Sequence, residues 1–338
     1  MSDSAAVAVV GAGSWGTALA LHVARLGRSV RLWARDPGLA RDIERTGENA
    51  RYLAGIPLPG VEVTPSGEHA LSTAAIVIVA VPSHGVEDVL APMSALIAPT
   101  ASVVSATKGL EPRCGRPISG LLAAMVPGRP IAVLSGPSFA REVAMGQPTA
   151  LVIAASDGSV ALRLQRELSA KAFRLYTNGD VLGVELGGAL KNVMALATGL
   201  CDGLGLGENA RAALITRGLA EMVRLGVALG AQPATFAGLA GLGDLVLTCT
   251  GTLSRNRALG REIARGRSLA EAEGATPMVA EGVRTTASAI RLARGAAIPM
   301  PICEEVGAVL FEAKPVRQAL EALLARDPRP EEEAGVLA

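Results

Sequence analysis

Aromatic residues are scarce in this chain of 338 residues, because phenylalanine, tryptophan and tyrosine together make up only 2% of it. A hydrophobic core must therefore be built mainly from alanine, valine, leucine and isoleucine. Nucleic-acid binding is not expected, since base-stacking side chains are few and 32 basic residues balance 31 acidic ones. The 39 glycines indicate tight turns and close helix packing.

Long hydrophobic runs are also missing, since no stretch of eighteen residues is apolar without interruption. The first residues, MSDSAAVAVVGAG, pass from a polar tail directly into a predicted strand without a basic segment. We therefore expect neither a signal peptide nor membrane insertion, and a cytoplasmic location. The four cysteines are far apart, without the spacing of a zinc site or a redox pair, which predicts reduced thiols and no metal.

Lysine occurs only four times, against 28 arginines, and two of the lysines, Lys108 and Lys191, fall in apolar segments. Lysine can release a proton under physiological conditions, whereas arginine cannot. Lys191 stands in the middle of residues 184–200, VELGGALKNVMALATGL, which predict a helix that is apolar nearly all round and therefore buried. A buried ammonium must find an anion, reach water or lose its proton. The alternative is a side chain that extends to the surface.

A glycine-rich turn follows the first predicted strand, over residues 6–10. Gly11, Gly13 and Gly16 form the pattern G-x-G-x-x-G, and a helix is predicted from residue 17 to 25. In a dinucleotide site the first glycine permits the turn, the second admits the pyrophosphate and the third lets helix and strand pack. An ordinary glycine-rich turn is the alternative.

The second predicted strand, residues 29–33, ends beside Arg35 and Asp36. A guanidinium at Arg35 suits the 2′-phosphate of NADP, whereas the carboxylate of Asp36 suits the free 2′-hydroxyl of NAD. We expect NADP(H) to be favoured, with NAD(H) also accepted. A solvated pair of loop charges is the alternative.

Further strands are predicted over 74–81, 102–106, 131–135, 149–154 and 173–176, giving a sheet of about seven or eight strands. Polar residues follow two of them at the edge where open α/β sheets bind ligands: Lys108 after one, and Gly136 with Ser138 after the other. Lys108 is a candidate for a phosphate or carbonyl contact, or else a surface lysine in a turn. His84 is predicted to be a loop histidine without a metal role.

After residue 178 the strands stop and only helices are predicted. The expected fold is an α/β Rossmann-type, doubly wound domain over residues 1–180, followed by an all-α domain over 181–326. Residues 327–338, rich in proline and glutamate, are expected to form a flexible tail.

Two stretches of the helical half contain candidate ligand groups. Asp244 ends a glycine-rich apolar segment, where it could pair with a buried lysine or cap the next helix. Ser254, Arg255 and Asn256 stand at a predicted helix start, which favours an oxyanion because arginines and helix N-termini both bind phosphate. Simple capping by Ser254, with solvated arginines, is the alternative.

Taken together, these segments resemble the bacterial NAD(P)-dependent glycerol-3-phosphate dehydrogenases, from Val7 to about Leu324. The most specific motifs are GAGSWGTALA at 11–20, SATKGLE at 105–111, LSGPSFARE at 134–142, ELGGALKNV at 185–193, GLGDLVLTCTGTLSRN at 241–256 and VAEGVRT at 279–285.

The resemblance implies reversible conversion of dihydroxyacetone phosphate into sn-glycerol 3-phosphate for glycerophospholipid synthesis, by a cytoplasmic homodimer. It implies that Lys191 is the proton donor and acceptor. The matching substrate-binding positions are Lys108, Gly136, Ser138, Lys191, Asp244, Ser254, Arg255 and Asn256. The positions that match dinucleotide contacts are Ser14, Trp15, Arg35, Lys108, Ala140, Arg255, Val279 and Glu281, besides Gly11, Gly13 and Gly16 of the turn.

Two other functions share parts of this pattern. A β-hydroxyacid dehydrogenase or ketopantoate-type reductase would have the glycine turn and a catalytic lysine, but a carboxylate pocket in place of the phosphate site at 254–256. A non-catalytic dinucleotide sensor would need the first domain but not Lys191 with Asp244.

Overall fold

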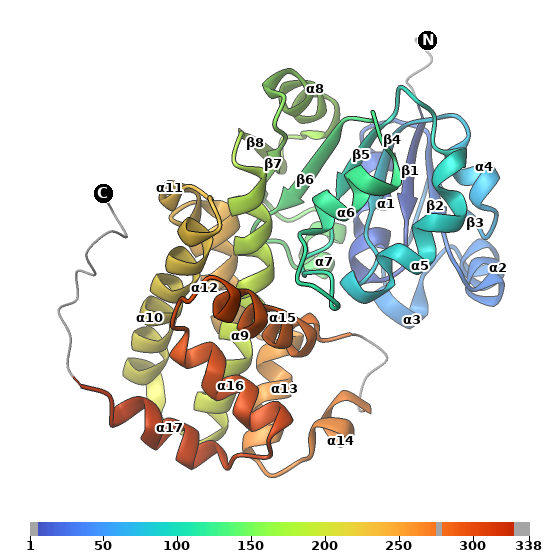
Figure 1. Ribbon diagram of the computed structural model, residues 1–338. Coiled ribbons are helices and arrows are strands. Elements are labelled where there is room, and N and C mark those ends of the chain that lie inside the picture. The colour runs from blue at the N-terminus through green and yellow to red at the C-terminus, as the bar shows by residue number, and fades with distance from the viewer. Residues whose placement is uncertain (1–5, 275–278, 328–338) are drawn as a thin grey trace. The chain divides into compact units, whose positions relative to one another are not determined.

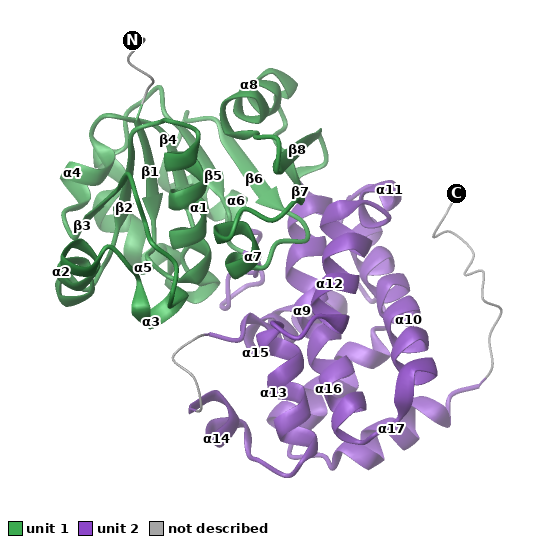
Figure 2. Cartoon of the chain, turned by 180° about the vertical axis from the view of Figure 1, so that it is seen from behind, with its two compact units in different colours: residues 1–107, 118–181 green, residues 108–117, 182–338 purple. Residues whose placement is uncertain are grey.

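The computed structural model describes residues 6–274 and 279–327, so the predicted tail lies outside the described residues apart from Asp327. The described chain divides into two compact units (Figure 2). Unit 1 comprises Met1–Thr107 and Ile118–Val181, and unit 2 comprises Lys108–Pro117 and Leu182–Ala338. The segment Lys108–Pro117 thus groups with the second unit, whereas the first domain was expected to span residues 1–180 without interruption.

Unit 1 is built on one eight-stranded sheet in the order β3-β2-β1-β4-β5-β6-β7-β8 (Figure 1). Neighbouring strands are parallel except for β6 and β7, which pair antiparallel. The strands are β1 (Ala6–Val10), β2 (Val30–Trp33), β3 (Val61–Thr64), β4 (Ala74–Val79), β5 (Ser102–Ser105), β6 (Ile131–Ser135), β7 (Thr149–Ala154) and β8 (Phe173–Asn178).

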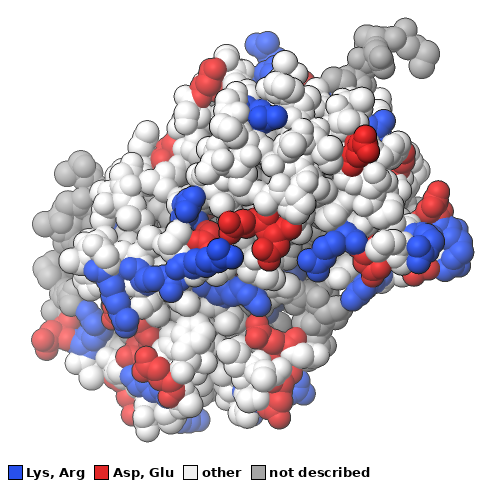
Figure 3. Space-filling model, turned by 45° about the vertical axis from the view of Figure 1, so that its right-hand side comes forward, with Lys and Arg blue, Asp and Glu red and all other residues white. Residues whose placement is uncertain are grey.

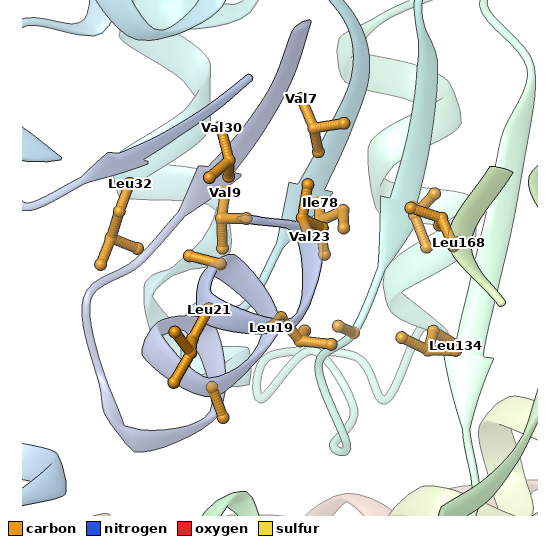
Figure 4. Packing of buried hydrophobic residues seen from close by; sticks show 14 of the residues in the cluster. Val7, Val9, Leu19, Leu21, Val23, Val30, Leu32, Ile78, Leu134 and Leu168 are labelled. Carbon is orange, nitrogen blue, oxygen red and sulfur yellow. The ribbon is translucent and has the colours of Figure 1, made fainter. Parts of the chain in front are cut away.

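Helices cover both faces of this sheet, because successive residues of a strand point to opposite sides. Val7 and Val9 of β1 pack into one hydrophobic cluster (Figure 4). Ala8 and Val10 pack into another. The helices of unit 1 are α1 (Ser14–Arg25), α2 (Pro37–Thr46), α3 (Ala50–Leu53), α4 (Gly67–Leu71), α5 (Val86–Leu90), α6 (Ile118–Met125), α7 (Ala140–Ala144) and α8 (Gly158–Leu168). The predicted doubly wound fold is confirmed.

Unit 2 is helical and is arranged around α9 (Val181–Gly203), which extends the predicted helix at both ends. The other helices are α10 (Gly207–Ala228), α11 (Pro233–Phe236), α12 (Asp244–Thr250), α13 (Arg255–Ala264), α14 (Leu269–Gly274), α15 (Glu281–Gly295), α16 (Pro301–Phe311) and α17 (Val316–Leu324). A π-helical turn over Leu239–Gly243 leads into α12.

Close backbone approach fixes the neighbours of α9. A Cβ atom placed on Gly199 would lie 2.1 Å from the carbonyl oxygen of Arg257, and one on Gly187 would lie 2.7 Å from that of Ala240. Only glycine allows these approaches, so the start of α13 and the π-helical turn before α12 both pack against α9. The two glycines therefore determine which side chains of α12 and α13 face Lys191 and its neighbours.

Two stretches pass a test of length and hydropathy for membrane-spanning helices, namely α9 and residues 233–250. Of the tested window, 89% is buried in α9 and 44% in the second stretch, which the structure divides among α11, the π-helical turn and α12. A core helix is expected to pass the same test, so α9 is explained by its burial in unit 2. Basic and acidic side chains lie near one another on the face shown in Figure 3, in keeping with the net charge of +1.

Candidate active site

Three segments of unit 2 bring two lysines to one aspartate. Lys191, from the middle of α9, places its Nζ 2.8 Å from Oδ1 of Asp244, the first residue of α12. Lys108, just after β5 in the chain, places its Nζ 2.9 Å from Oδ2 of the same carboxylate. The sequence left open whether Asp244 pairs with a lysine or caps a helix. The structure shows the pair, and the N-cap position of α12 is Gly243.

Thr248 completes the surroundings of Lys191. The ammonium donates to its hydroxyl at 2.7 Å, and that hydroxyl donates to the carbonyl oxygen of Asp244 at 2.6 Å. Thr248 was not among the predicted site residues, although it stands four residues after Asp244 and therefore on the same face of α12. The Lys191 side chain is only 8% exposed and Asp244 only 1%, so the orientation of the ammonium is fixed by these two partners.

The charges of this cluster do not cancel, because one carboxylate faces two lysines. The pKa of Lys108 is lowered from its ordinary value to about 8, because burial and the positive charge of Lys191 together outweigh the charge and the hydrogen bond of Asp244, which raise it. With both lysines protonated the cluster carries one net positive charge in a poorly hydrated place. Such a cluster favours an anionic ligand or an oxygen that gains negative charge during a reaction.

A chain of buried amides connects the lysine cluster to α13 and α15. Asn192 donates from Nδ2 to the carbonyl oxygen of Lys108 at 2.9 Å, and its Oδ1 accepts from Nδ2 of Asn256 at 2.8 Å. The Oδ1 of Asn256 accepts in turn from the backbone N–H of Gly282 at 2.9 Å. Asn192 was not among the predicted site residues, although it follows Lys191 directly.

The start of α13 combines capping with ligand chemistry. Ser254 is the N-cap residue and its hydroxyl accepts from the N–H of Arg257 at 3.3 Å, as the simpler alternative predicted. Arg257 is not solvated as that alternative supposed, since its Nε lies 2.6 Å from Asp202 and its Nη1 donates to the carbonyl oxygen of Thr250 at 2.8 Å. Its guanidinium thus fixes the loop before α13.

Arg255 is exposed, at the first position of α13. Desolvation by surrounding atoms lowers the pKa of its guanidinium, and the negative charge of Glu281 raises it. Arginine remains charged under either influence. Glu281 begins α15 and Val279 lies two residues before it, and both are positions matched to dinucleotide contacts.

The glycine turn of unit 1 has the shape that a dinucleotide requires. Gly11 has φ +112°, and a Cβ on Gly16 would lie 1.9 Å from the carbonyl oxygen of Gly11. A Cβ on Gly13 would meet no atom of the described chain within 4 Å, so there is open space beside this backbone. The N-cap residue of α1 is Gly13, which has no side chain to cap the helix, and a helix N-terminus favours an anion. The turn therefore fits a pyrophosphate.

The remaining predicted residues of unit 1 come after three strands, β1, β2 and β6. The hydroxyl of Ser14 donates to the carbonyl oxygen of Tyr52 at 2.7 Å, and Trp15, next in α1, is partly buried. Arg35 is exposed after β2. After β6, Gly136 has φ +129°, Ser138 donates from Oγ to the carbonyl oxygen of Gly136 at 2.9 Å, and Ala140 begins α7.

The model of the NAD-dependent glycerol-3-phosphate dehydrogenase N-terminus matches residues 6–161, and that of the C-terminus matches residues 180–321. The chain belongs to this family. It is 51% identical over 329 residues to the glycerol-3-phosphate dehydrogenase (NAD(P)+) of Geobacter sulfurreducens, covering 96% of this chain and 98% of that one. The enzyme of the same name from Moorella thermoacetica is 49% identical over 331 residues, covering 97% and 98%.

Solved structures agree with this membership. The crystal structure of glycerol-3-phosphate dehydrogenase from Coxiella burnetii superposes with a TM-score of 0.92 at 41% identity, covering 96% of this chain and 99% of that one. A ketopantoate reductase from Ralstonia eutropha superposes with a TM-score of 0.62 at 19% identity, covering 94% and 99%. The second likeness shows a shared fold alone. It explains why the sequence of this glycerol-3-phosphate dehydrogenase family member also has features of a ketopantoate-type reductase.

Within residues 6–274 and 279–327, no group of three or more histidine, cysteine, aspartate or glutamate side chains is arranged to hold a metal ion. His84 lies in a 3₁₀ turn over Ser83–Gly85. Cys201, Cys249 and Cys303 are buried free thiols, and Cys114 is an exposed one.

Proposed function

We propose that the chain interconverts dihydroxyacetone phosphate and sn-glycerol 3-phosphate with a nicotinamide dinucleotide, and that Lys191 is its proton donor and acceptor. The observation that carries the role of Lys191 is its buried ion pair with Asp244, which also holds Lys108. Bound NAD(P)H supplies the hydride for the reduction, and NAD(P)+ accepts it in the reverse direction.

In the reduction, the ammonium of Lys191 donates a proton to the substrate oxygen as the carbonyl becomes an alcohol. Lys191 becomes a neutral amine and is protonated again from solvent, so one proton is consumed in each turnover. In the oxidation, the neutral amine accepts the hydroxyl proton. Asp244 and Thr248 hold the nitrogen in one position, which favours transfer along a fixed direction.

The phosphate is assigned to the start of α13. Arg255 supplies a charged guanidinium there, and the helix N-terminus supplies its dipole. The hydroxyl of Ser254 and the amide of Asn256 complete this site, and Gly136 and Ser138 after β6 are further substrate positions. Lys108 contributes positive charge, with its backbone fixed by Asn192.

The dinucleotide is assigned to the glycine turn of Gly11, Gly13 and Gly16, with Ser14, Trp15 and Arg35 as further contacts. Lys108, Ala140, Arg255, Val279 and Glu281 complete the proposed set. NADP(H) is the preferred cofactor and NAD(H) is also accepted, without a metal. We further assign the protein to the cytoplasm as a homodimer supplying glycerophospholipid synthesis, without membrane insertion or nucleic-acid binding.

The test follows NADPH oxidation with dihydroxyacetone phosphate and, separately, with a panel of 2- and 3-keto acids. The expected result is rapid oxidation with dihydroxyacetone phosphate alone, and sn-glycerol 3-phosphate as the product. Turnover of a keto acid in preference to dihydroxyacetone phosphate would instead assign a hydroxyacid dehydrogenase or ketopantoate-type reductase. NADPH binding without any turnover would leave a dinucleotide sensor.

A further inference from the structure

Hydrogen bonds join the short helix α3 to the glycine turn of unit 1 and the start of α1. Asn49, its N-cap residue, is fully buried and donates from Nδ2 to the carbonyl oxygen of Ala12 at 2.9 Å and to Oγ1 of Thr17 at 2.8 Å. From the other side, the hydroxyl of Ser14 donates to the carbonyl oxygen of Tyr52. In Figure 1, α3 lies at the edge of the sheet where β1 ends. Side chains of α3 therefore have a fixed position relative to the proposed dinucleotide site.

Arg51 is the charged residue that α3 places at this edge. Its Nη1 lies 3.6 Å from Oδ2 of Asp36, and its guanidinium lies over the ring of Tyr52, 5.3 Å from the centroid. Both side chains of the ion pair are about half exposed, 53% for Arg51 and 55% for Asp36. A surface pair of this kind contributes little to stability, so a stronger anion can replace one partner at small cost.

Asp36 already has a second role, because its Oδ1 accepts from the N–H of Gly38 at 2.8 Å and thereby caps α2. Its carboxylate is thus fixed close to the end of β2, where a Rossmann-type fold places the 2′ substituent of the adenosine ribose. A 2′-phosphate beside an unneutralised carboxylate would be repelled. Arg51 supplies the charge that offsets this repulsion.

We propose that Arg51 determines cofactor specificity, acting with Arg35 to bind the 2′-phosphate of NADP(H). The phosphate carries close to two negative charges, and two guanidinium groups, one after β2 and one from α3, match it. When NAD(H) is bound, Arg51 stays on Asp36 and the carboxylate accepts from the 2′-hydroxyl. The same three side chains thereby accept both cofactors and favour the phosphorylated one. This inference rests on the proposed dinucleotide function.

The test compares Arg51→Ala with wild type in binding rather than turnover. Dissociation constants are measured by calorimetry for NADPH, NADH, adenosine 2′,5′-bisphosphate and AMP. Arg45→Ala is the matched control, because Arg45 is an exposed arginine that pairs with Asp42 within α2. We expect Arg51→Ala to weaken NADPH and the bisphosphate about tenfold, with NADH and AMP within about twofold, and Arg45→Ala to change none of them beyond about twofold.

A second variant acts in the opposite direction. Asp36→Asn keeps a side chain that can cap α2 but removes the carboxylate charge, so NADPH should bind more tightly than in wild type. The inference is overturned if Arg51→Ala weakens NADPH and NADH equally, or if it leaves the preference for NADPH unchanged. If the wild-type protein binds neither dinucleotide, the proposed function itself fails, which is a separate outcome.

Discussion

Two aspartates of unit 2 each hold two cationic side chains, but the cations differ in their chemistry. Asp244 binds Lys191 at 2.8 Å and Lys108 at 2.9 Å. Asp202, at the end of α9, binds Nε of Arg211 at 2.9 Å and Nε of Arg257 at 2.6 Å. The geometry is similar, yet only the lysines can release a proton, because a guanidinium remains charged at any physiological pH.

Lysine is scarce in this chain, and the two aspartate clusters differ in whether they use it. With only four lysines against 28 arginines, two lysines converge on the more buried aspartate, while arginines fill the purely ionic cluster. The lysine cluster is suited to proton transfer and the Asp202 cluster to holding α9, α10 and α13 together. Removing one cation from each cluster should therefore have different consequences.

The largest expected effect is that of Lys191→Ala. Turnover should fall by about 10²- to 10⁴-fold, because the proton of the substrate oxygen loses its donor, while calorimetry should show NADPH binding within about twofold of wild type. Asp244 keeps Lys108 as a partner in this variant, so the fold should persist. Lys191→Arg keeps a charge but no transferable proton and should be nearly as slow. Normal turnover in either variant would remove Lys191 from the mechanism.

Arg255→Ala should raise the KM for dihydroxyacetone phosphate about 10- to 100-fold, which corresponds to the loss of a charged hydrogen bond. The effect on kcat should be much smaller, because the phosphate is held in the ground state and the transition state alike. Steady-state kinetics over a range of substrate concentrations measure both constants. Arg261→Ala is the control, since Arg261 is an exposed residue of the same helix. An unchanged KM would place the phosphate elsewhere.

The lysine cluster should also give the pH profile a descending limb. Because the pKa of Lys108 is lowered to about 8, its ammonium is present below that pH and lost above it. The value of kcat/KM for dihydroxyacetone phosphate should then fall above pH 8, at most tenfold per pH unit for one proton. Lys108→Arg should flatten this limb, and Lys171→Arg, at an exposed lysine of unit 1, should leave it unchanged. A limb that persists in Lys108→Arg belongs to another group.

Sequence patterns were sufficient to predict the parts of the structure that depend on contacts between residues close in the chain. The glycine turn between β1 and α1 and the buried helix around Lys191 depend on neighbours within a few residues, and both were predicted. β3 was missed because its four residues, VEVT, form a short edge strand that is mostly not buried. The antiparallel pairing of β7 with β6 was not predicted either, since a buried strand has the same apolar pattern in both directions.

The site depended more on packing between distant segments. Asp244 is 53 residues from Lys191 in the chain, and its choice between pairing and capping follows from the approach of the π-helical turn to Gly187. Asn192 joins Lys108 to Asn256 because α13 lies against α9 at Gly199. No spacing in the sequence encodes these contacts, so the residue types were predictable but the network was not.

The smallest effect on catalysis is expected from the Asp202 cluster. Arg211→Ala removes one of two cations from an aspartate, as Lys191→Ala does, and leaves Arg257 on Asp202. Because Arg211 and Asp202 are largely buried, the free energy of unfolding should drop by about 1–3 kcal/mol, measured by urea denaturation. The kcat and the KM should stay within about twofold, since Arg257 still holds the loop before α13. A loss of kcat comparable to that of Lys191→Ala would show that the two clusters are not divided between structure and catalysis.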